Sequence, residues 1–238
     1  MIEWQRLTNP EVDALDRRIP VLVPIGLIEA HGPHLSLGVD IDTAEYFSRA
    51  IAERTGAILA PGLPYGFADE MREYPGTLGL SHDTFATVIA ELGGMFCLHG
   101  FQRLIFLSGH GANKGPCEAA FWRIWERYPD ARLACWNWWT EAGIGGIHHA
   151  DKGETEVAAV TGAVHHPERA QDFRIDKPWY KLRSRHALNP DSGGINGEPT
   201  RADLDLGRQN RDRTVEVLSA RVADIMRAEG LVPLGDTA

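Results

Sequence analysis

Residues 19–26 form an apolar run that does not alternate with polar side chains and is rich in β-branched residues. A strand buried on both faces has this pattern, because helices cover a parallel sheet on each side. Residues 103–108 have the same character, and shorter apolar runs lie at 56–60 and 132–136. The sequence therefore predicts four strands of a mainly parallel sheet.

The segments between and after these strands repeat apolar residues with the spacing of an amphipathic helix. Helices are expected at residues 43–54, from Ser81 to Gly100, from residue 113, at 154–164 and at 213–228. Strands that alternate with helices build βαβ units. We therefore predict an α/β fold: one domain, residues 1–238, in α/β/α layers around the sheet. The glycine-rich stretch 191–205 is interpreted as a loop.

Composition excludes several classes of protein. The 238 residues carry a formal net charge of −9, and the short basic run at 181–186 is interpreted as a solvated loop, so no nucleic-acid partner is expected. No apolar run is long enough to cross a membrane. Neither a signal-peptide pattern nor a Cys-x-x-Cys pair is present, and Cys97, Cys117 and Cys135 read as buried free thiols. A cytoplasmic location is the expectation.

Acidic and imidazole side chains follow three of the predicted strands. They are Glu29, His31 and Asp40 after the first strand, His110 after residues 103–108, and His149 and Glu154 after residues 132–136. In parallel α/β sheets, ligands bind beyond the carboxyl ends of the strands. These side chains are therefore expected to meet at one edge of the sheet.

Mixed imidazole and carboxylate ligands suit Zn²⁺, Mn²⁺ or Fe²⁺ better than Ca²⁺ or Mg²⁺. Glu29 and His31 project to the same side of an extended segment, and the carboxylate of Asp40 can bridge two ions. Each residue alone is more often an ordinary hydrogen-bonded loop residue. Only the joint pattern favours a metal centre.

Two other groups of residues leave alternatives open. The tryptophans at 136, 138 and 139 fit the core or an interface better than a pocket wall. His34 fits either support of the metal ligands or loop structure. The glycine-rich segment at 109–115 lacks the spacing of nucleotide-binding loops, so a phosphate site is not favoured.

Five blocks of sequence resemble the creatininase family of metal-dependent amidohydrolases. Residues 24–40, PIGLIEAHGPHLSLGVD, are similar to that family's N-terminal signature. Four blocks follow in the family's order: YPGTLGL at 74–80, SGHGAN at 108–113, His149-Ala150 with Glu154-Thr155, and GINGEP at 194–199. The resemblance thus spans nearly the whole chain.

The resemblance implies a two-metal site in which an activated hydroxide attacks an amide carbonyl. One ion would be held by Glu29, Asp40 and His110, and the other by His31, Asp40 and Glu154. Zinc is the expected metal, with manganese or iron as alternatives. His149 matches the family's proton-transferring histidine, so we assign it and Glu154 as catalytic residues; His149 could instead orient the substrate. Hexamers are usual in the family, which predicts a homo-oligomer.

The chain departs from the enzymes that open creatinine at several positions around the expected substrate. Gly111 and Ala112 stand where those enzymes have an aromatic residue and a glutamate, and Gly145 replaces a tryptophan. Met71 occupies the place of a common histidine, with Glu70 beside it. Creatinine is therefore not the expected substrate.

The predicted activity is hydrolysis of a C–N bond, other than a peptide bond, in a small cyclic or linear amide of the lactam or formamide type. Glu70, Gly111 and Asn113 are the predicted substrate-binding residues. Hydrolytic C–C ring opening of a cyclic ketone such as a keto-inositol is one alternative. A metal-binding protein without turnover is another.

Overall fold

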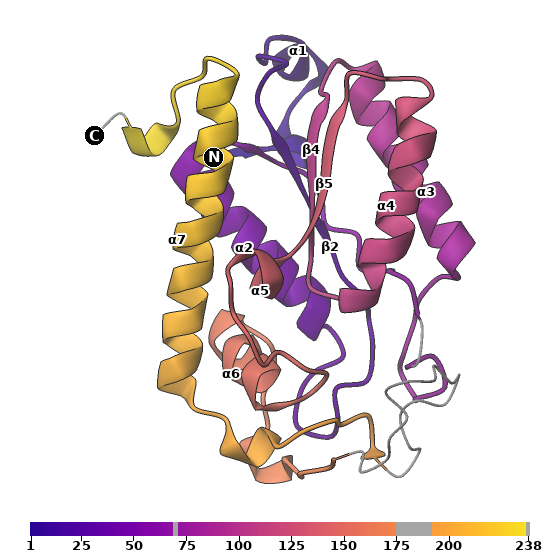
Figure 1. The fold of residues 1–238 in the computed structure, drawn as a ribbon, viewed down its shortest axis with the longest axis vertical. Coiled ribbons are helices and arrows are strands. Elements are labelled where there is room, and N and C mark those ends of the chain that lie inside the picture. The colour runs from indigo at the N-terminus through magenta and orange to yellow at the C-terminus, as the bar shows by residue number, and fades with distance from the viewer. Residues whose placement is uncertain (69–70, 175–191, 237–238) are drawn as a thin grey trace.

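The structure, a computed structural model, describes residues 1–68, 71–174 and 192–236. Its centre is a five-stranded sheet in the order β1-β3-β2-β4-β5, in which every pairing is parallel (Figure 1). The strands are β1 (Ile2–Glu3), β2 (Val21–Ile25), β3 (Ile58–Leu59), β4 (Arg103–Ser108) and β5 (Arg132–Asn137). The predicted α/β fold with a parallel sheet is confirmed.

Helices cover both faces of the sheet (Figure 1). The longer helices are α2 (Val39–Thr55), α3 (His82–Leu98), α4 (Lys114–Trp125), α6 (Lys152–Thr161) and α7 (Leu204–Ala228). Two short helices are α1 (Asn9–Asp13) and α5 (Trp138–Glu141). Single 3-10 turns lie at Trp4–Arg6, Gly111–Asn113, Pro167–Arg169, Pro199–Arg201 and Leu234–Asp236. No helix of the described part of the chain is long and apolar enough to cross a membrane.

Two hydrophobic cores lie on opposite faces of the sheet, because successive side chains of each strand point to opposite faces. Leu104 and Phe106 pack with Phe85 of α3 and Phe121 of α4. Ile105 and Leu107 pack in the second core, which also contains Phe47, Trp138, Leu218 and Val222. The three cysteines are buried and free, as predicted.

Strand register brings the ends of the central strands to one level. Ile25 of β2 pairs with Ser108 of β4, and Ser108 pairs with Asn137 of β5. The residues that follow these three strands therefore leave the sheet at the same edge. This edge carries the candidate site.

Helix boundaries differ from the predicted ones where the apolar repeat gives no signal. Helix α7 begins at Leu204 instead of residue 213, within the stretch interpreted as a loop. Its first turns are mostly polar, and the carboxylate of Asp203 caps them by accepting hydrogen bonds from the backbone N–H groups of Asp205 and Leu206. Ser81 caps α3 as expected, since its hydroxyl accepts from the N–H of Thr84. The basic run at 181–186 lies outside the described residues.

Gly109 and Gly26 let the start of α2 approach the ends of β2 and β4. A Cβ added at Gly109 would lie 1.9 Å from the carbonyl oxygen of Asp40, and one added at Gly26 would lie 2.4 Å from the backbone nitrogen of Ile41. These close approaches place Asp40 directly beside the strand ends.

Substitution of Gly109 by alanine should destabilise the fold and displace Asp40, because backbone atoms cannot yield to the new methyl group as a flexible side chain can. We expect a loss of about 2–3 kcal/mol in the free energy of unfolding, measured by urea denaturation. Gly115→Ala is the matched control, since nothing lies within 4 Å of a Cβ there. Equal stabilities of the two variants would contradict the packing argument.

Candidate metal centre

Glu29 and His31 lie on an extended stretch just beyond the end of β2. An isolated bridge between Ile28 and Leu78 holds this stretch, and the N–H of Glu29 donates to the carbonyl of Leu37 at 2.9 Å. The side chains of Glu29 and His31 are both buried and face the same cluster. Asp40 joins them from the first turn of α2.

His110 follows β4, and a reciprocal contact fixes its backbone. The Ser108 hydroxyl accepts from the His110 N–H at 3.1 Å and donates to the His110 carbonyl at 2.7 Å. Glu154 lies in the first turn of α6, where its Oε2 accepts from the backbone N–H of Ala150 at 2.5 Å. The end of β4 and the start of α6 thus supply residues to the same place.

The side chains form overlapping clusters of potential metal ligands. One cluster contains Glu29, Asp40 and His110, a second contains His31, Asp40 and Glu154, and a third contains Glu29, His31 and His149. In each cluster, the ligand atoms lie within 4.8 Å of one another. Asp40 belongs to both of the first two clusters, which match the two sets that the family resemblance implies.

The distances between these atoms suit a shared ion. His110 Nδ1 lies 3.2 Å from Glu29 Oε1 and 3.3 Å from Asp40 Oδ2. His31 Nε2 lies 3.4 Å from Asp40 Oδ1 and 3.5 Å from Glu154 Oε2. Around a tetrahedral ion with bonds of about 2.1 Å, neighbouring ligand atoms lie roughly 3.4 Å apart.

Several of these buried polar atoms make no hydrogen bond within the described structure. Both carboxylate oxygens of Glu29, Nε2 of His31 and Oδ2 of Asp40 are in this state. Burial of polar atoms that make no hydrogen bond is costly, and a bound cation would coordinate them. The donor set of the described residues therefore fits divalent metal ions.

The surrounding protein shifts the pKa values of these buried groups away from their ordinary values. Burial would raise the pKa of Glu29, but the imidazoles of His110 and His149 hold it well below its usual range. Burial would lower the pKa of His31, yet the carboxylates of Glu154 and Asp40 raise it well above normal. Asp40 has a raised pKa because it is buried and lies beside Glu29. Imidazoles thus balance part of the acidic charge.

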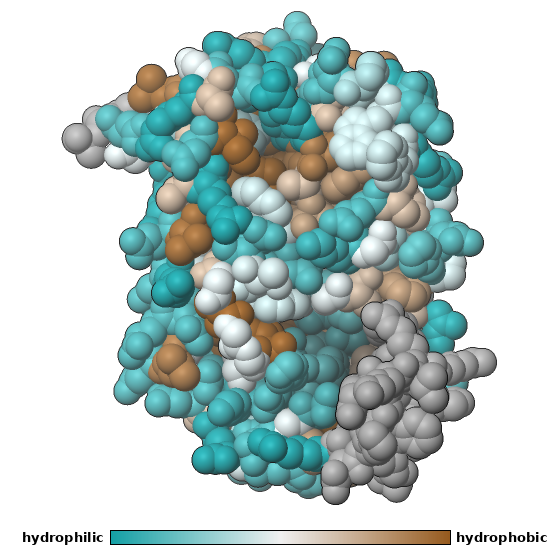
Figure 2. Space-filling model, in the orientation of Figure 1, coloured by the Kyte–Doolittle hydropathy of each residue, from teal (hydrophilic) through white to brown (hydrophobic). Residues whose placement is uncertain are grey.

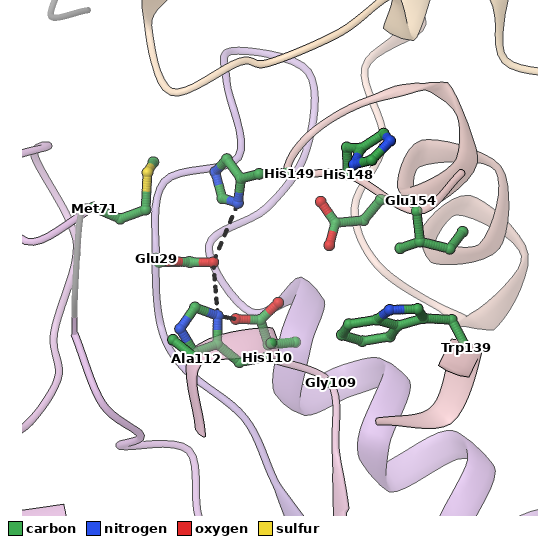
Figure 3. Close-up of a pocket in the computed structure, with 12 residues that line it drawn as sticks. Glu29, Met71, Gly109, His110, Ala112, Trp139, His148, His149 and Glu154 are labelled. Atoms are coloured by element: carbon green, nitrogen blue, oxygen red, sulfur yellow. Dashed lines mark ion pairs between the residues drawn. The ribbon is translucent and has the colours of Figure 1, made fainter. Parts of the chain in front are cut away.

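His149 is held against the extended segment that carries Glu29 and His31. Its Nε2 lies 2.8 Å from the carbonyl oxygen of Ala30, and its Nδ1 lies 3.3 Å from Glu29 Oε1 (Figure 3). Because a carbonyl only accepts, Nε2 must carry the hydrogen of this bond. Nδ1 is therefore the nitrogen that faces the acidic cluster.

A pocket of about 210 Å³ opens above the cluster. In Figure 3, Met71 and Trp139 stand on opposite sides of it, with Glu29, His110 and His149 between them. A Cβ added at Gly111 would lie 3.7 Å from the Trp139 ring, so Trp139 borders the space that an aromatic side chain at position 111 would enter.

The three predicted substrate-binding residues have different positions. Gly111 lines the pocket. Asn113 is fully buried and is not among the lining residues; its side-chain oxygen accepts from the N–H of Phe67 and its NH₂ donates to the carbonyl of Gly26. Glu70 lies outside the described residues. Asn113 thus ties the loop before residue 68 to the end of β2.

Sequence reasoning did not name Ile147 or His148 as residues of the pocket wall, whereas it placed Met71 near the expected substrate. Trp139 packs against the core, as favoured, and also lines the pocket, which was the less favoured alternative. One signal was available, because Trp139 comes two residues after β5 ends, at the edge of the sheet where ligands bind.

His34 links the segment that carries Glu29 and His31 to α6. Its ring is buried, and its Nε2 lies 3.0 Å from the hydroxyl oxygen of Thr155, the neighbour of Glu154. Burial, with help from nearby histidines, lowers the pKa of His34 to about 4. The ring is therefore neutral and supports the start of α6.

This lowered pKa predicts a loss of stability in mild acid. The unfolded chain takes up a proton at His34 near pH 6.5, whereas the folded chain does so only near pH 4. The contribution of neutral His34 to the free energy of unfolding is therefore fully present above pH 6.5. It falls by roughly 2–3 kcal/mol as the pH drops to 4. Urea denaturation of His34→Gln should show a shallower decline in this window, and parallel declines would contradict the assignment.

Comparison with known proteins identifies a family of similar proteins. The family model described as creatininase, creatinine amidohydrolase, matches residues 5–222. A mycofactocin precursor peptide peptidase from Mycobacterium ulcerans is 31% identical over 146 residues, which are 58% of this chain and 56% of the relative. A 3-dehydro-scyllo-inosose hydrolase from Thermotoga maritima is 28% identical over 112 residues, 46% of this chain and 36% of the relative. The chain thus spans about half or less of these relatives' lengths.

Solved structures share the fold. A creatininase variant described as the Zn-Zn type superposes with a TM-score of 0.80 at 19% identity, covering 93% of this chain and 97% of that one. A structure described as creatininase Mn has a TM-score of 0.80 at 21% identity, covering 94% and 98%. At such identities the likeness shows the fold.

Proposed function

Because this chain belongs to the creatininase family, we propose that it is a hydrolase that cleaves the C–N bond of an amide with two divalent metal ions. The observation that carries the proposal is the position of Asp40, which belongs to two buried ligand clusters at once. A carboxylate shared in this way is suited to hold two ions close together.

Glu29, Asp40 and His110 would hold one ion, and His31, Asp40 and Glu154 would hold the other. When bound, the pair would polarise the substrate carbonyl and lower the pKa of water at the site. Glu154 is fixed for this role by the N–H of Ala150. Zinc is the proposed metal, with manganese or iron as alternatives.

His149 would donate the proton that the leaving nitrogen needs. Since its Nε2 hydrogen is engaged by the carbonyl of Ala30, the proton would be transferred from Nδ1. The position of Nδ1 beside Glu29 supports this role, because the carboxylate raises the pKa of the ring against the opposing effect of burial. Met71 and Trp139 would limit the access of water around the reacting group.

A hydrolysis screen tests the proposed activity. Protein that has been stripped by a chelator and reloaded with Zn²⁺ or Mn²⁺ would be offered formamides, lactams and short peptides, with the stripped protein as the control. We expect hydrolysis of at least one amide class only after reloading. Peptides belong in the panel because a peptidase is among the relatives.

Ring opening of a cyclic ketone is the second candidate. The likeness to the inosose hydrolase favours it, and polarisation of a ketone carbonyl requires the same ions as polarisation of an amide. Keto-cyclitols therefore join the screen, and their selective hydrolysis would replace the amide assignment. Metal binding without hydrolysis of any class would instead support a protein without turnover.

Assembly into a homo-oligomer, with a hexamer as the form expected from the resemblance, remains a prediction. Light scattering on the purified protein tests it against the 26.3 kDa mass of one chain.

A further inference from the structure

A second cavity adjoins the pocket above the ligand clusters. It has a volume of about 350 Å³ and is lined by His148, Asp151, Arg174, Asn196 and Gly197. His148 also lines the first pocket, so the two cavities are neighbours. Outside the grey area, the lower part of the face in Figure 2 is mostly hydrophilic. Four of the five lining residues of the second cavity are polar or charged, so this cavity suits a polar group.

The second cavity lies on the side of the pocket where His149 is located. His148 precedes His149 directly, and the N–H of Asn196 donates to the carbonyl of His149 at 3.1 Å. If His149 protonates the leaving nitrogen, the chemical group attached to that nitrogen points toward His148 and Asn196. The amine portion of the substrate would then extend into the second cavity.

Two arginines and two carboxylates meet at this cavity. Glu198 Oε2 accepts from Arg174 at 2.6 Å and from Arg201 at 3.3 Å, so one carboxylate is shared by two guanidinium groups. Asp151 also lines the cavity, but its Oδ1 accepts from the backbone N–H groups of Lys152 and Glu198, both at 2.7 Å. Its negative charge also lies at the N-terminus of α6, where the helix dipole offsets it.

Arg174 is the arginine of this pair that lines the cavity. Its guanidinium has five donors in a planar fork, so the bond to Glu198 leaves donors for a second acceptor. Two of these donors match the two oxygens of a carboxylate.

Resting on the proposed amide hydrolysis, we propose that the substrate's amine portion ends in a carboxylate that Arg174 binds in the second cavity. Water adds to the amide carbon, the C–N bond breaks, and the nitrogen takes up a proton. The products are a carboxylic acid and an amino acid or a similar amino carboxylate. The site would thus favour N-acyl amino acids and similar N-acyl amino carboxylates.

The test compares acids with uncharged counterparts. N-formyl derivatives of glycine, β-alanine and γ-aminobutyrate would be offered to the metal-loaded protein beside N-formyl derivatives of the corresponding amino alcohols. We expect kcat/KM to favour the acid at the chain length that reaches Arg174, through a lower KM. In Arg174→Ala, the acid-to-alcohol ratio should fall by about five-fold, the upper range for an exposed ion pair.

Arg201→Ala is the matched control, because Arg201 contacts the same carboxylate of Glu198 but does not line the cavity. It should keep the wild-type ratio. Equal ratios in the wild type and Arg174→Ala, or the same fall in both variants, would overturn the role of Arg174 while leaving amide hydrolysis intact. Absence of hydrolysis of every amide by the wild type would overturn both proposals.

Discussion

Asp40→Ala should bind neither metal ion and lose almost all hydrolytic activity. Asp40 is the residue that the clusters around His110 and His31 have in common, so its removal leaves each with two ligands. We expect kcat/KM to fall by about four orders of magnitude or more, because the site loses its means of activating water. Elemental analysis and the hydrolysis assay measure the two effects.

Asp42→Ala is the matched control. Asp42 lies in the same first turn of α2 but belongs to none of the clusters of the described residues. This variant should retain both ions and most of the activity. Full metal content in Asp40→Ala would contradict the bridging role of Asp40.

Asp40→Ala should also be no less stable than the wild type once both proteins are stripped of metal. Burial and the neighbouring Glu29 raise the pKa of Asp40, so its ionised form opposes folding near neutral pH. Alanine removes this cost while leaving a small cavity. A large loss of stability in the metal-free variant would show that Asp40 has a structural role instead.

His149→Ala should lower turnover by about two to four orders of magnitude and leave the metal content near two ions per chain. A positioned general acid contributes roughly this much to a proton transfer. His149 also forms a ligand cluster with Glu29 and His31, so metal analysis decides between the two roles. Loss of an ion in His149→Ala would identify the residue as a ligand, and unchanged turnover would exclude both roles.

His148→Ala gives the comparison for the adjacent position. His148 is exposed and lines the pocket, but no cluster of the described residues includes it. Its substitution should change turnover by less than about ten-fold, because His148 is not the residue proposed to protonate the leaving nitrogen.

Much of the fold could be predicted because a strand that is buried on both faces has an unbroken run of apolar residues in the sequence. The unbroken apolar runs predicted β2 and β4. The rule that ligands bind at the carboxyl ends of parallel strands predicted that the acidic and imidazole side chains meet, namely Glu29, His31, Asp40, His110 and Glu154. The short strand β1 and helix α1 were missed, because two and five residues are too short for a periodic pattern.

The substrate wall could be predicted less well, since it depends on how loops pack. Asn113 lies three positions after His110 and was expected to face the substrate, yet its side chain turns inward to hydrogen-bond the backbone of Phe67 and Gly26. The pairing of Arg174 with Glu198, across 24 positions, likewise depends on tertiary structure. Sequence patterns report burial and periodicity but not which polar loop residue turns toward a cavity.

The number of metal ions per chain is the most direct test of the central claim. After reconstitution with Zn²⁺ and removal of free metal, elemental analysis of the wild type should give two ions per chain. Crystals of the same protein should show two anomalous scattering peaks flanking the Asp40 carboxylate. Less than one tightly bound ion per chain, or two ions away from Asp40, would contradict the account.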